Sequence, residues 1–284
     1  MAVMKSIELK TKKGKCISVV LVVFLSIGAV VQFLPLLWMI LGTFKTETEL
    51  TSAIPYVFPA TWSFKAYAEA FSKYHIMDNF FNTLIICASV VLLQVSNSAV
   101  AGYVLSKLKP RSGGFWYMMF LGTMMFSGTA LMFPLYIMMT QLGLIGSKLA
   151  LILSSSVWAY SIVLFKSFFD NIPQDLVEAA SIDGASSLRI FVTMIIPLSK
   201  PVLAVNILNT FMAVYNDFLY PLMLLPNEKD WTVMMRLYMM DKLGTIPHNV
   251  IYVLMVAVVL PILVLYLFVQ KHITEGVSTT GLKG

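Results

Sequence analysis

Hydrophobic residues along this chain form six long runs separated by shorter polar segments. Each run has the roughly 20 apolar residues that a helix needs to cross the hydrocarbon of a bilayer. An open strand could not satisfy its backbone hydrogen bonds in lipid, so the runs predict helices. We therefore expect an all-α polytopic membrane protein with spans at about 17–42, 80–104, 115–139, 149–168, 201–223 and 249–269.

The most polar long interruption, residues 178–201, is too hydrophilic to cross a bilayer and has the pattern of two short amphipathic helices. Asn171 is expected to cap the first helix, with Gln174 three residues later as its reciprocal partner and Pro173 in the first turn. Gly184 is expected to end that helix in a left-handed conformation that a side chain would resist.

The second of these helices is expected to begin after Ser186 or Ser187 and to run until Pro197 interrupts it. The two helices and the glycine between them predict an elbow that lies on the membrane surface, shaped to be held by another protein. Its apolar residues recur at helical spacing: Leu176, Val177, Ala180, Leu188, Phe191, Met194 and Ile195.

The basic residues orient the predicted helices. Most of the 20 Lys and Arg residues fall on the side that holds both termini, which the positive-inside rule places in the cytoplasm. The basic start of the chain adjoins a span, so lipid headgroups explain it better than nucleic acid does. We expect a basic cytoplasmic N-terminus at 1–16, a transmembrane domain at 17–270 with a coupling loop at 170–200, and a cytoplasmic tail at 271–284.

Composition supports a membrane protein, because 58% of the 284 residues are hydrophobic, 12% are charged and the mean hydropathy is +0.83. The only Gly-Lys pair, Gly14-Lys15, lacks the upstream glycine of a phosphate-binding loop, so any ATP would be bound by another chain. Cys16 and Cys87 lie too far apart in sequence to suggest a disulfide framework. The histidines, His75, His248 and His272, lack metal-ligand spacing, and we expect no catalytic or metal-binding residue.

The polar interruption resembles the cytoplasmic loop of bacterial ABC-importer permeases. That family's pattern is Glu-Ala-Ala, three residues, Gly, nine residues and Ile-x-Leu-Pro. Here Glu178-Ala179-Ala180 precedes Gly184 at this spacing, and Met194-Ile195-Ile196-Pro197 stands where Ile-x-Leu-Pro belongs. Both departures, Met for Ile and Ile for Leu, keep the apolar character.

Other segments are similar to carbohydrate permeases of the maltose type. Ala101-Gly102-Tyr103 ends the second predicted span, and Asn216-Asp217-Phe218 with Pro221-Leu222 lies in the fifth. The tail Gly281-Leu282-Lys283-Gly284 stands where such permeases commonly have Gly-Ala-Lys-Gly. Tyr215 stands where the family usually has Trp.

The resemblance implies a transport subunit without an ATPase site in a bacterial cell membrane. Its expected partners are a second related permease, two cytoplasmic ATPase subunits that carry ATP and Mg, and an extracytoplasmic solute-binding protein. Carbohydrate would be the solute. The subunit itself would contact membrane lipid, and no nucleic acid is expected as a partner. The residues expected to couple to the ATPases are Glu178, Ala179, Ala180, Asp183, Gly184, Ala185 and Pro197.

Polar residues in the fifth predicted span recur at steps of three and four, which places them on one face of a helix. Amides facing lipid would be unfavourable, so this face should line a solute pathway or form hydrogen bonds between helices. The candidate pathway residues are Asn206, Asn209, Thr210, Ala213, Tyr215, Asn216, Asp217 and Tyr220.

The sequence thus predicts an ATP-driven, binding-protein-dependent importer permease for an oligosaccharide or glycoside, working by alternating access. A permease for an amino acid or phosphonate is the nearest alternative, and the tail argues against it. An ion-coupled secondary transporter would need inverted repeats, broken spans in both halves and a carboxylate at the bilayer midplane, which the sequence does not display. A scaffold without transport would not need the polar face of the fifth span.

Overall fold

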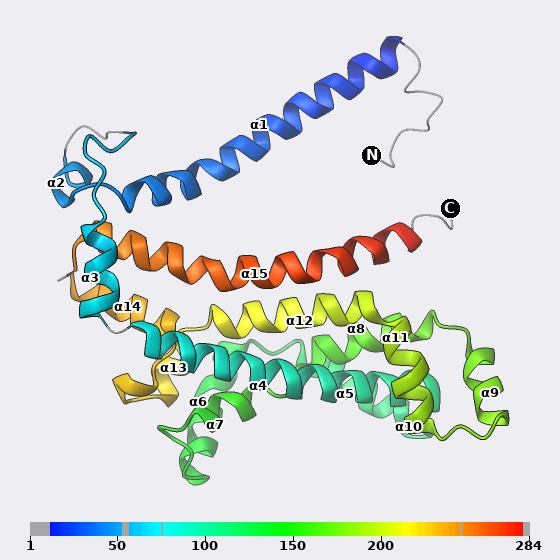
Figure 1. The fold of residues 1–284 in the computed structure, drawn as a ribbon. Coiled ribbons are helices and arrows are strands. Elements are labelled where there is room, and N and C mark those ends of the chain that lie inside the picture. The colour runs from blue at the N-terminus through cyan, green and yellow to red at the C-terminus, as the bar shows by residue number, and fades with distance from the viewer. Residues whose placement is uncertain (1–11, 53–56, 75, 245, 281–284) are drawn as a thin grey trace. The chain divides into compact units, whose positions relative to one another are not determined.

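The structure, a computed structural model, describes residues 12–52, 57–74, 76–244 and 246–280. Among these residues the regular structure is helical throughout, without a strand. The basic residues up to position 11, His75 and the tail motif at 281–284 lie outside the described residues. The chain divides into two compact units, one of residues 1–75, 243–260 and 280–284 and the other of residues 76–242 and 261–279 (Figure 1).

Three helices are each long and apolar enough to cross a membrane, and the described residues hold up to six spans if each of three bent helix pairs counts as one. The long helices are α1 (Lys12–Gly42), α4 (Ile76–Tyr103) continued by the π-helical turn η2 (Val104–Leu108), and α15 (His248–Thr280). The first bent pair is α5 (Gly113–Thr123) with α6 (Gly128–Gln141), at 103°. The second is α7 (Lys148–Ser154) with α8 (Ala159–Asp170), at 43°.

The expectation of one continuous helix over 201–223 is wrong. Helix α12 (Lys200–Tyr215) stops at Tyr215, and α13 (Leu219–Leu224) begins after a three-residue break. The amide of Asn216 donates to the Met212 carbonyl, and Asp217 Oδ1 accepts the N–H of Leu219 at 2.9 Å. Short polar side chains that bind the backbone in this way compete with helical hydrogen bonds, and here they end one helix and start the next.

In the first unit, the end of α1 packs on the start of α15. A Cβ on Gly42 would lie 2.7 Å from the Tyr252 ring, so only a glycine permits this approach. The Asn249 amide donates to the Lys45 carbonyl at 3.2 Å, and the Lys45 ammonium lies 4.1 Å from the centre of the Trp38 ring. The two short helices of this unit are α2 (Glu47–Leu50) and α3 (Lys65–Lys73).

Glu49 holds the loop that follows α1. Its carboxylate accepts the N–H of Thr46 at 2.8 Å and that of Ala60 at 2.9 Å, so it ties together two points of the loop. The hydrogen bond from the Thr46 backbone is the main reason that the pKa of the Glu49 carboxyl lies below its usual range.

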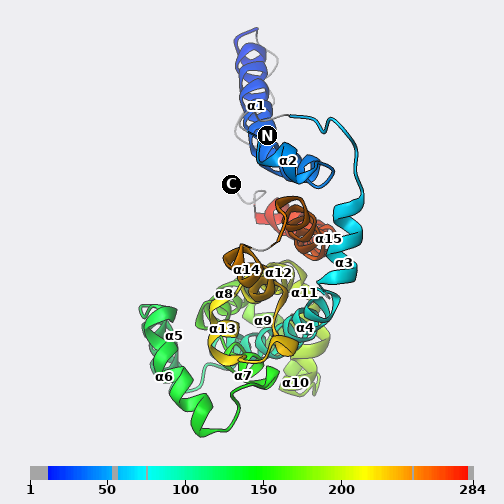
Figure 2. The same cartoon turned by 90° about the vertical axis from the view of Figure 1, so that its left-hand side faces the viewer.

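In the second unit, α4 is the central helix. It packs along α8 and α12, and Figure 2 views these three helices nearly along their axes. Gly102 of α4 is buried against α8, where a Cβ would lie 2.7 Å from Phe165 Cβ and 3.0 Å from the Lys166 backbone nitrogen. Tyr103, Phe165 and Phe169 belong to one apolar core at this crossing.

A second apolar core lies toward the other end of α4, around Ile86 and Val90. The amides of Asn79 and Asn82 reach the backbone carbonyls of Trp231 and Lys229, which fixes the loop before α14 (Val233–Leu243). That loop contains the 3₁₀ turn η4 (Glu228–Asp230).

We predict that Gly102→Ala lowers the thermal stability of the purified chain. The added methyl group would force α4 away from α8, and overpacking of this kind costs about 1–3 kcal/mol. Gly122→Ala on α5 is the matched control, because nothing lies within 4 Å of a Cβ there. A thermal unfolding series in detergent should show a lower midpoint for Gly102→Ala alone; equal midpoints would contradict the close approach.

We also predict that the stabilisation of its loop by Glu49 is complete above the ordinary pKa of a glutamate, about 4.3, and declines as the pH falls below that value. A folded-state pKa below the unfolded value gives stability that is present above that pH and is lost as the pH falls through the folded value. At neutral pH, Glu49→Gln should therefore lower the hydrogen-exchange protection factor of the Ala60 amide. The difference from the wild type should vanish in strong acid, and a difference that persists there would exclude the carboxylate as its cause.

Candidate functional site

The first helix of the elbow, α9 (Gln174–Ile182), begins after Pro173. The expectation that Asn171 caps it is wrong, because Asn171 ends α8 instead and its amide donates to the Ser167 carbonyl at 2.8 Å. With that bond made inside α8, the side chain is not available to α9. The expected glycine turn is confirmed, since Gly184 has φ +82° and nothing within 4 Å of a Cβ position.

The second helix begins as expected, with the Ser186 hydroxyl accepting the Arg189 N–H at 3.3 Å. Its segments are α10 (Ser187–Ile190), the π-helical turn η3 (Phe191–Ile195) and α11 (Ile196–Leu198). The expectation that Pro197 interrupts it is wrong, since the 82° bend falls two residues later, at Ser199. The wide π turn leaves Pro197 in the first turn of α11, where its missing N–H is not needed.

The elbow has a buried inner side and an exposed outer side. Val177 is 6% exposed, and Ala180 and Ala185 pack against the same core as Tyr103. The other expected coupling residues, Glu178, Ala179, Asp183, Gly184 and Pro197, are exposed. Beside them, large apolar side chains are also uncovered: Leu176, Ile182 at 86% and Leu188 at 71% exposure.

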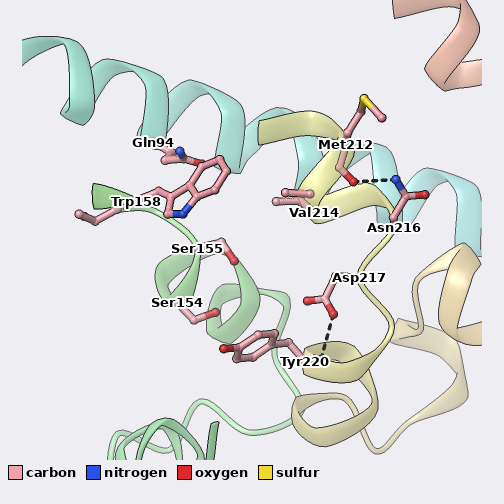
Figure 3. A pocket seen from close by; sticks show the side chains of 11 residues that line it. Gln94, Ser154, Ser155, Trp158, Met212, Val214, Asn216, Asp217 and Tyr220 are labelled. Carbon is pink, nitrogen blue, oxygen red and sulfur yellow. Dashed lines mark hydrogen bonds between the residues drawn. The ribbon is translucent and has the colours of Figure 1, made fainter. Parts of the chain in front are cut away.

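A pocket of about 470 Å³ opens in the second unit (Figure 3). The end of α7 and the segment after it supply Ser154, Ser155 and Trp158, and α4 supplies Gln94. The end of α12, the break after it and α13 supply the other side: Met212, Ala213, Val214, Asn216, Asp217 and Tyr220.

Hydrogen bonds fix much of this lining. The Gln94 amide donates to Ser161 Oγ of α8 at 2.9 Å, and Tyr220 Oη donates to the Gly128 carbonyl at 3.1 Å. Asp217 Oδ1 accepts from the backbone of Leu219 and Tyr220, which holds the carboxylate at the pocket (Figure 3). The pocket therefore offers amide, hydroxyl and carboxylate groups beside the rings of Trp158 and Tyr220.

The structure brings only part of the expected polar face to this pocket. Ala213, Asn216, Asp217 and Tyr220 line it. Asn206, Thr210 and Tyr215 are fully buried within the unit, and Asn209 is half-buried. The pocket lies at the end of α12, so Ala213 in the last turn lines it while Asn206 and Thr210, further back along the helix, are covered by the unit. Asn216, Asp217 and Tyr220 follow in the break and in α13.

The sequence analysis missed Gln94, Ser154, Ser155 and Trp158. The run of three serines at 154–156, inside an apolar segment, was the signal that could have located the break between α7 and α8. The hydroxyls of Ser154 and Ser156 donate hydrogen bonds to the carbonyls of Leu151 and Leu153, respectively, which helps to end α7.

Comparison with known proteins identifies the family of this chain. A model of the family described as "binding-protein-dependent transport system inner membrane component" matches residues 2–279. The chain belongs to this family of ABC-transporter permeases. It is a membrane-spanning transport subunit.

Several curated relatives of this permease align over almost their whole length. The chain is 30% identical to protein LplC of Bacillus subtilis, with 96% of this chain and 97% of the relative covered. It is 29% identical to the diacetylchitobiose uptake permease NgcG of Streptomyces coelicolor, with 89% and 85% covered. It is 27% identical to the trehalose/maltose permease MalG of Thermococcus litoralis, with 94% and 97% covered.

The fold has a solved counterpart. A chain of a bacterial ABC transporter involved in the import of the acidic polysaccharide alginate superposes with a TM-score of 0.80. The superposition covers 92% of this permease and 98% of that chain at 23% identity, so it supports the likeness of the fold.

We predict that the pocket is wet while the buried part of the polar face is not. In a Cys16→Ala background, Ala213→Cys and Asn216→Cys should react quickly with a charged, membrane-impermeant thiol reagent. Thr210→Cys, one helical turn from position 213, should react at least about tenfold more slowly because the position is fully buried. Mass spectrometry of the labelled permease gives the rates, and equal rates at 210 and 213 would contradict the described burial.

Proposed function

We propose that this permease is one membrane half of an ATP-driven importer that takes up an oligosaccharide or another carbohydrate. The observation that carries the proposal is the match of the whole chain to importer permeases, together with an exposed elbow at the position of the family's coupling loop. The printed names of several relatives refer to sugars, including diacetylchitobiose and trehalose/maltose.

The chemistry of the pocket supports a carbohydrate solute. Sugars present hydroxyl groups that both donate and accept hydrogen bonds, and their C–H faces pack on aromatic rings. Asn216 and Asp217 supply groups that could hydrogen-bond sugar hydroxyls, and Trp158 and Tyr220 supply aromatic rings at the same pocket. Such a mixture of a few polar groups and aromatic side chains is typical of small-molecule sites. Asn206, Asn209, Thr210 and Tyr215 would then serve the pathway indirectly, by packing α12.

The outer side of the elbow supports a docking role. Ile182 and Leu188 are exposed beside the charge of Glu178. Large apolar side chains that are exposed together in this way are typical of a surface that contacts another protein. We propose that the exposed coupling residues Glu178, Ala179, Asp183, Gly184 and Pro197 form the contact with a partner ATPase that binds ATP and Mg. Ala180 and Ala185 would serve coupling by packing the elbow against the core. Hydrolysis would occur on that partner, and this permease would contribute no catalytic residue.

The proposed assembly has six spans in this chain, with both termini in the cytoplasm, a second related permease, two ATPase subunits and an extracytoplasmic binding protein. The loops at 43–79 and 224–248 would then face the binding protein. Closure of the ATPases would move the elbow, and the helices would convert that movement into alternating access.

The experiment is uptake by the complete complex in proteoliposomes, with ATP inside and the binding protein outside. A panel of labelled oligosaccharides, amino acids and phosphonates should give ATP-dependent uptake of a carbohydrate alone. Uptake of an amino acid or phosphonate instead would overturn the substrate class, and uptake driven by an ion gradient without ATP would overturn the mechanism.

A second prediction concerns coupling at the elbow. Gly184→Val places a β-branched side chain at φ +82°, which strains the turn by about 1 kcal/mol or more. The variant should reach the membrane but lose most of its transport and its stimulation of ATP hydrolysis by loaded binding protein. Gly143→Val is the matched control, since Gly143 has φ +67° and open space but lies outside the elbow. Equal transport by both variants would remove the argument for coupling.

A further inference from the structure

The end of α4 contacts the elbow at two points, just before its first helix and at the start of its second. Tyr103 Oη donates to the carbonyl of Ser187, the first residue of α10, at 3.2 Å. Lys107 Nζ donates to the carbonyl of Ile172, two residues before α9 begins. Tyr103 and Lys107 are four residues apart, so they share one face of α4 and its π-helical extension η2.

Both side chains are buried where they make these contacts. Tyr103 is 4% exposed and its ring lies 5.0 Å from that of Phe191, which follows α10. Lys107 is 6% exposed, and an ammonium buried to that extent needs a polar partner. The Ile172 carbonyl supplies it.

A third bond holds the same turn to α8. Ser106 Oγ donates to Asp170 Oδ1 at 2.7 Å, and Lys166 Nζ donates to the other carboxylate oxygen at 2.7 Å. Asp170 is the last residue of α8, so α4, the end of α8 and the start of the elbow are joined at one point. Loss of the hydrogen bonds at this point would release α9 while leaving the rest of the α4–α8 contact in place.

A more central part of the same helix reaches the pocket. Gln94 lines the pocket and is nine positions before Tyr103, about 13.5 Å along α4 at 1.5 Å per residue. A displacement of the elbow that is passed to Tyr103 and Lys107 would therefore move a helix that forms part of the pocket wall.

We propose that Tyr103 and Lys107 are positioning residues that fix the elbow to α4 and pass its movement to the pocket. The proposal rests on the coupling role of the elbow given above. A simple capping role for Lys107, in which it only satisfies a carbonyl near the end of α8, would instead affect stability and assembly alone.

The test uses Lys107→Met, which keeps the length of the side chain and removes its charge and donors. Lys107→Arg is the conservative variant, and Arg111→Met is the matched control because it removes an exposed cation nearby. Tyr103→Phe removes only the hydroxyl and keeps the ring against Phe191. All are compared in the complete complex reconstituted in lipid.

Two readouts are needed. Backbone hydrogen exchange over 172–190 should be about fivefold faster in Lys107→Met and Tyr103→Phe, as expected for the loss of one hydrogen bond. Solute transported per ATP hydrolysed should fall at least about threefold in both, with assembly and basal hydrolysis unchanged. Lys107→Arg should recover at least half of the loss, and Arg111→Met should match the wild type.

The proposal is overturned if Lys107→Met and Tyr103→Phe transport as efficiently as the wild type, whatever their exchange rates. It is also overturned if transport falls while exchange over 172–190 does not change. If Lys107→Met does not assemble, Tyr103→Phe decides between the outcomes. A wild-type complex that fails to transport any carbohydrate would refute the proposed function instead, and the exchange data would still test the contact between α4 and the elbow.

Discussion

The close packing of α4 against α8 is the interaction on which the rest of the second unit depends. Gly102 lets the two backbones approach until a single methyl group would collide with Phe165. Hydrogen bonds then fix the pair at two levels, from Gln94 to Ser161 and from Ser106 to Asp170. Buried polar groups are satisfied in only one alignment of the two helices. This packing therefore determines the register of α4 against α8 and the residues that the ends of these helices contact.

Breaks in the helices make the pocket possible. An unbroken α12 would have carried Asn216 and Tyr220 onward around a helix, whereas the break at 216–218 turns them toward the segment between α7 and α8. Interrupted backbone at membrane depth is tolerated where protein or water surrounds it. The same polar groups that satisfy the backbone at the break, Asn216 and Asp217, also line the pocket.

The elbow combines a fixed inner side with an uncovered outer side. Val177 and Ile190 belong to the core under it. Lys107 binds the segment just before its first helix, and Tyr103 binds the start of its second. Ile182 and Leu188 remain exposed on the other side. A segment fixed on one side and uncovered on the other is suited to carrying force from a partner into the bundle.

The sequence by itself determined the helical class, the glycine turn at Gly184 and the Ser186 cap, because composition and left-handed backbone geometry are local properties. It also identified the permease family through Glu178–Pro197. Only the tertiary structure decided that Asn171 ends α8, that Asn206 and Thr210 are buried, and that Gln94 and Trp158 join the pocket. The reason is that these outcomes depend on which helix lies opposite each side chain, and periodicity along one helix carries no information about its neighbours.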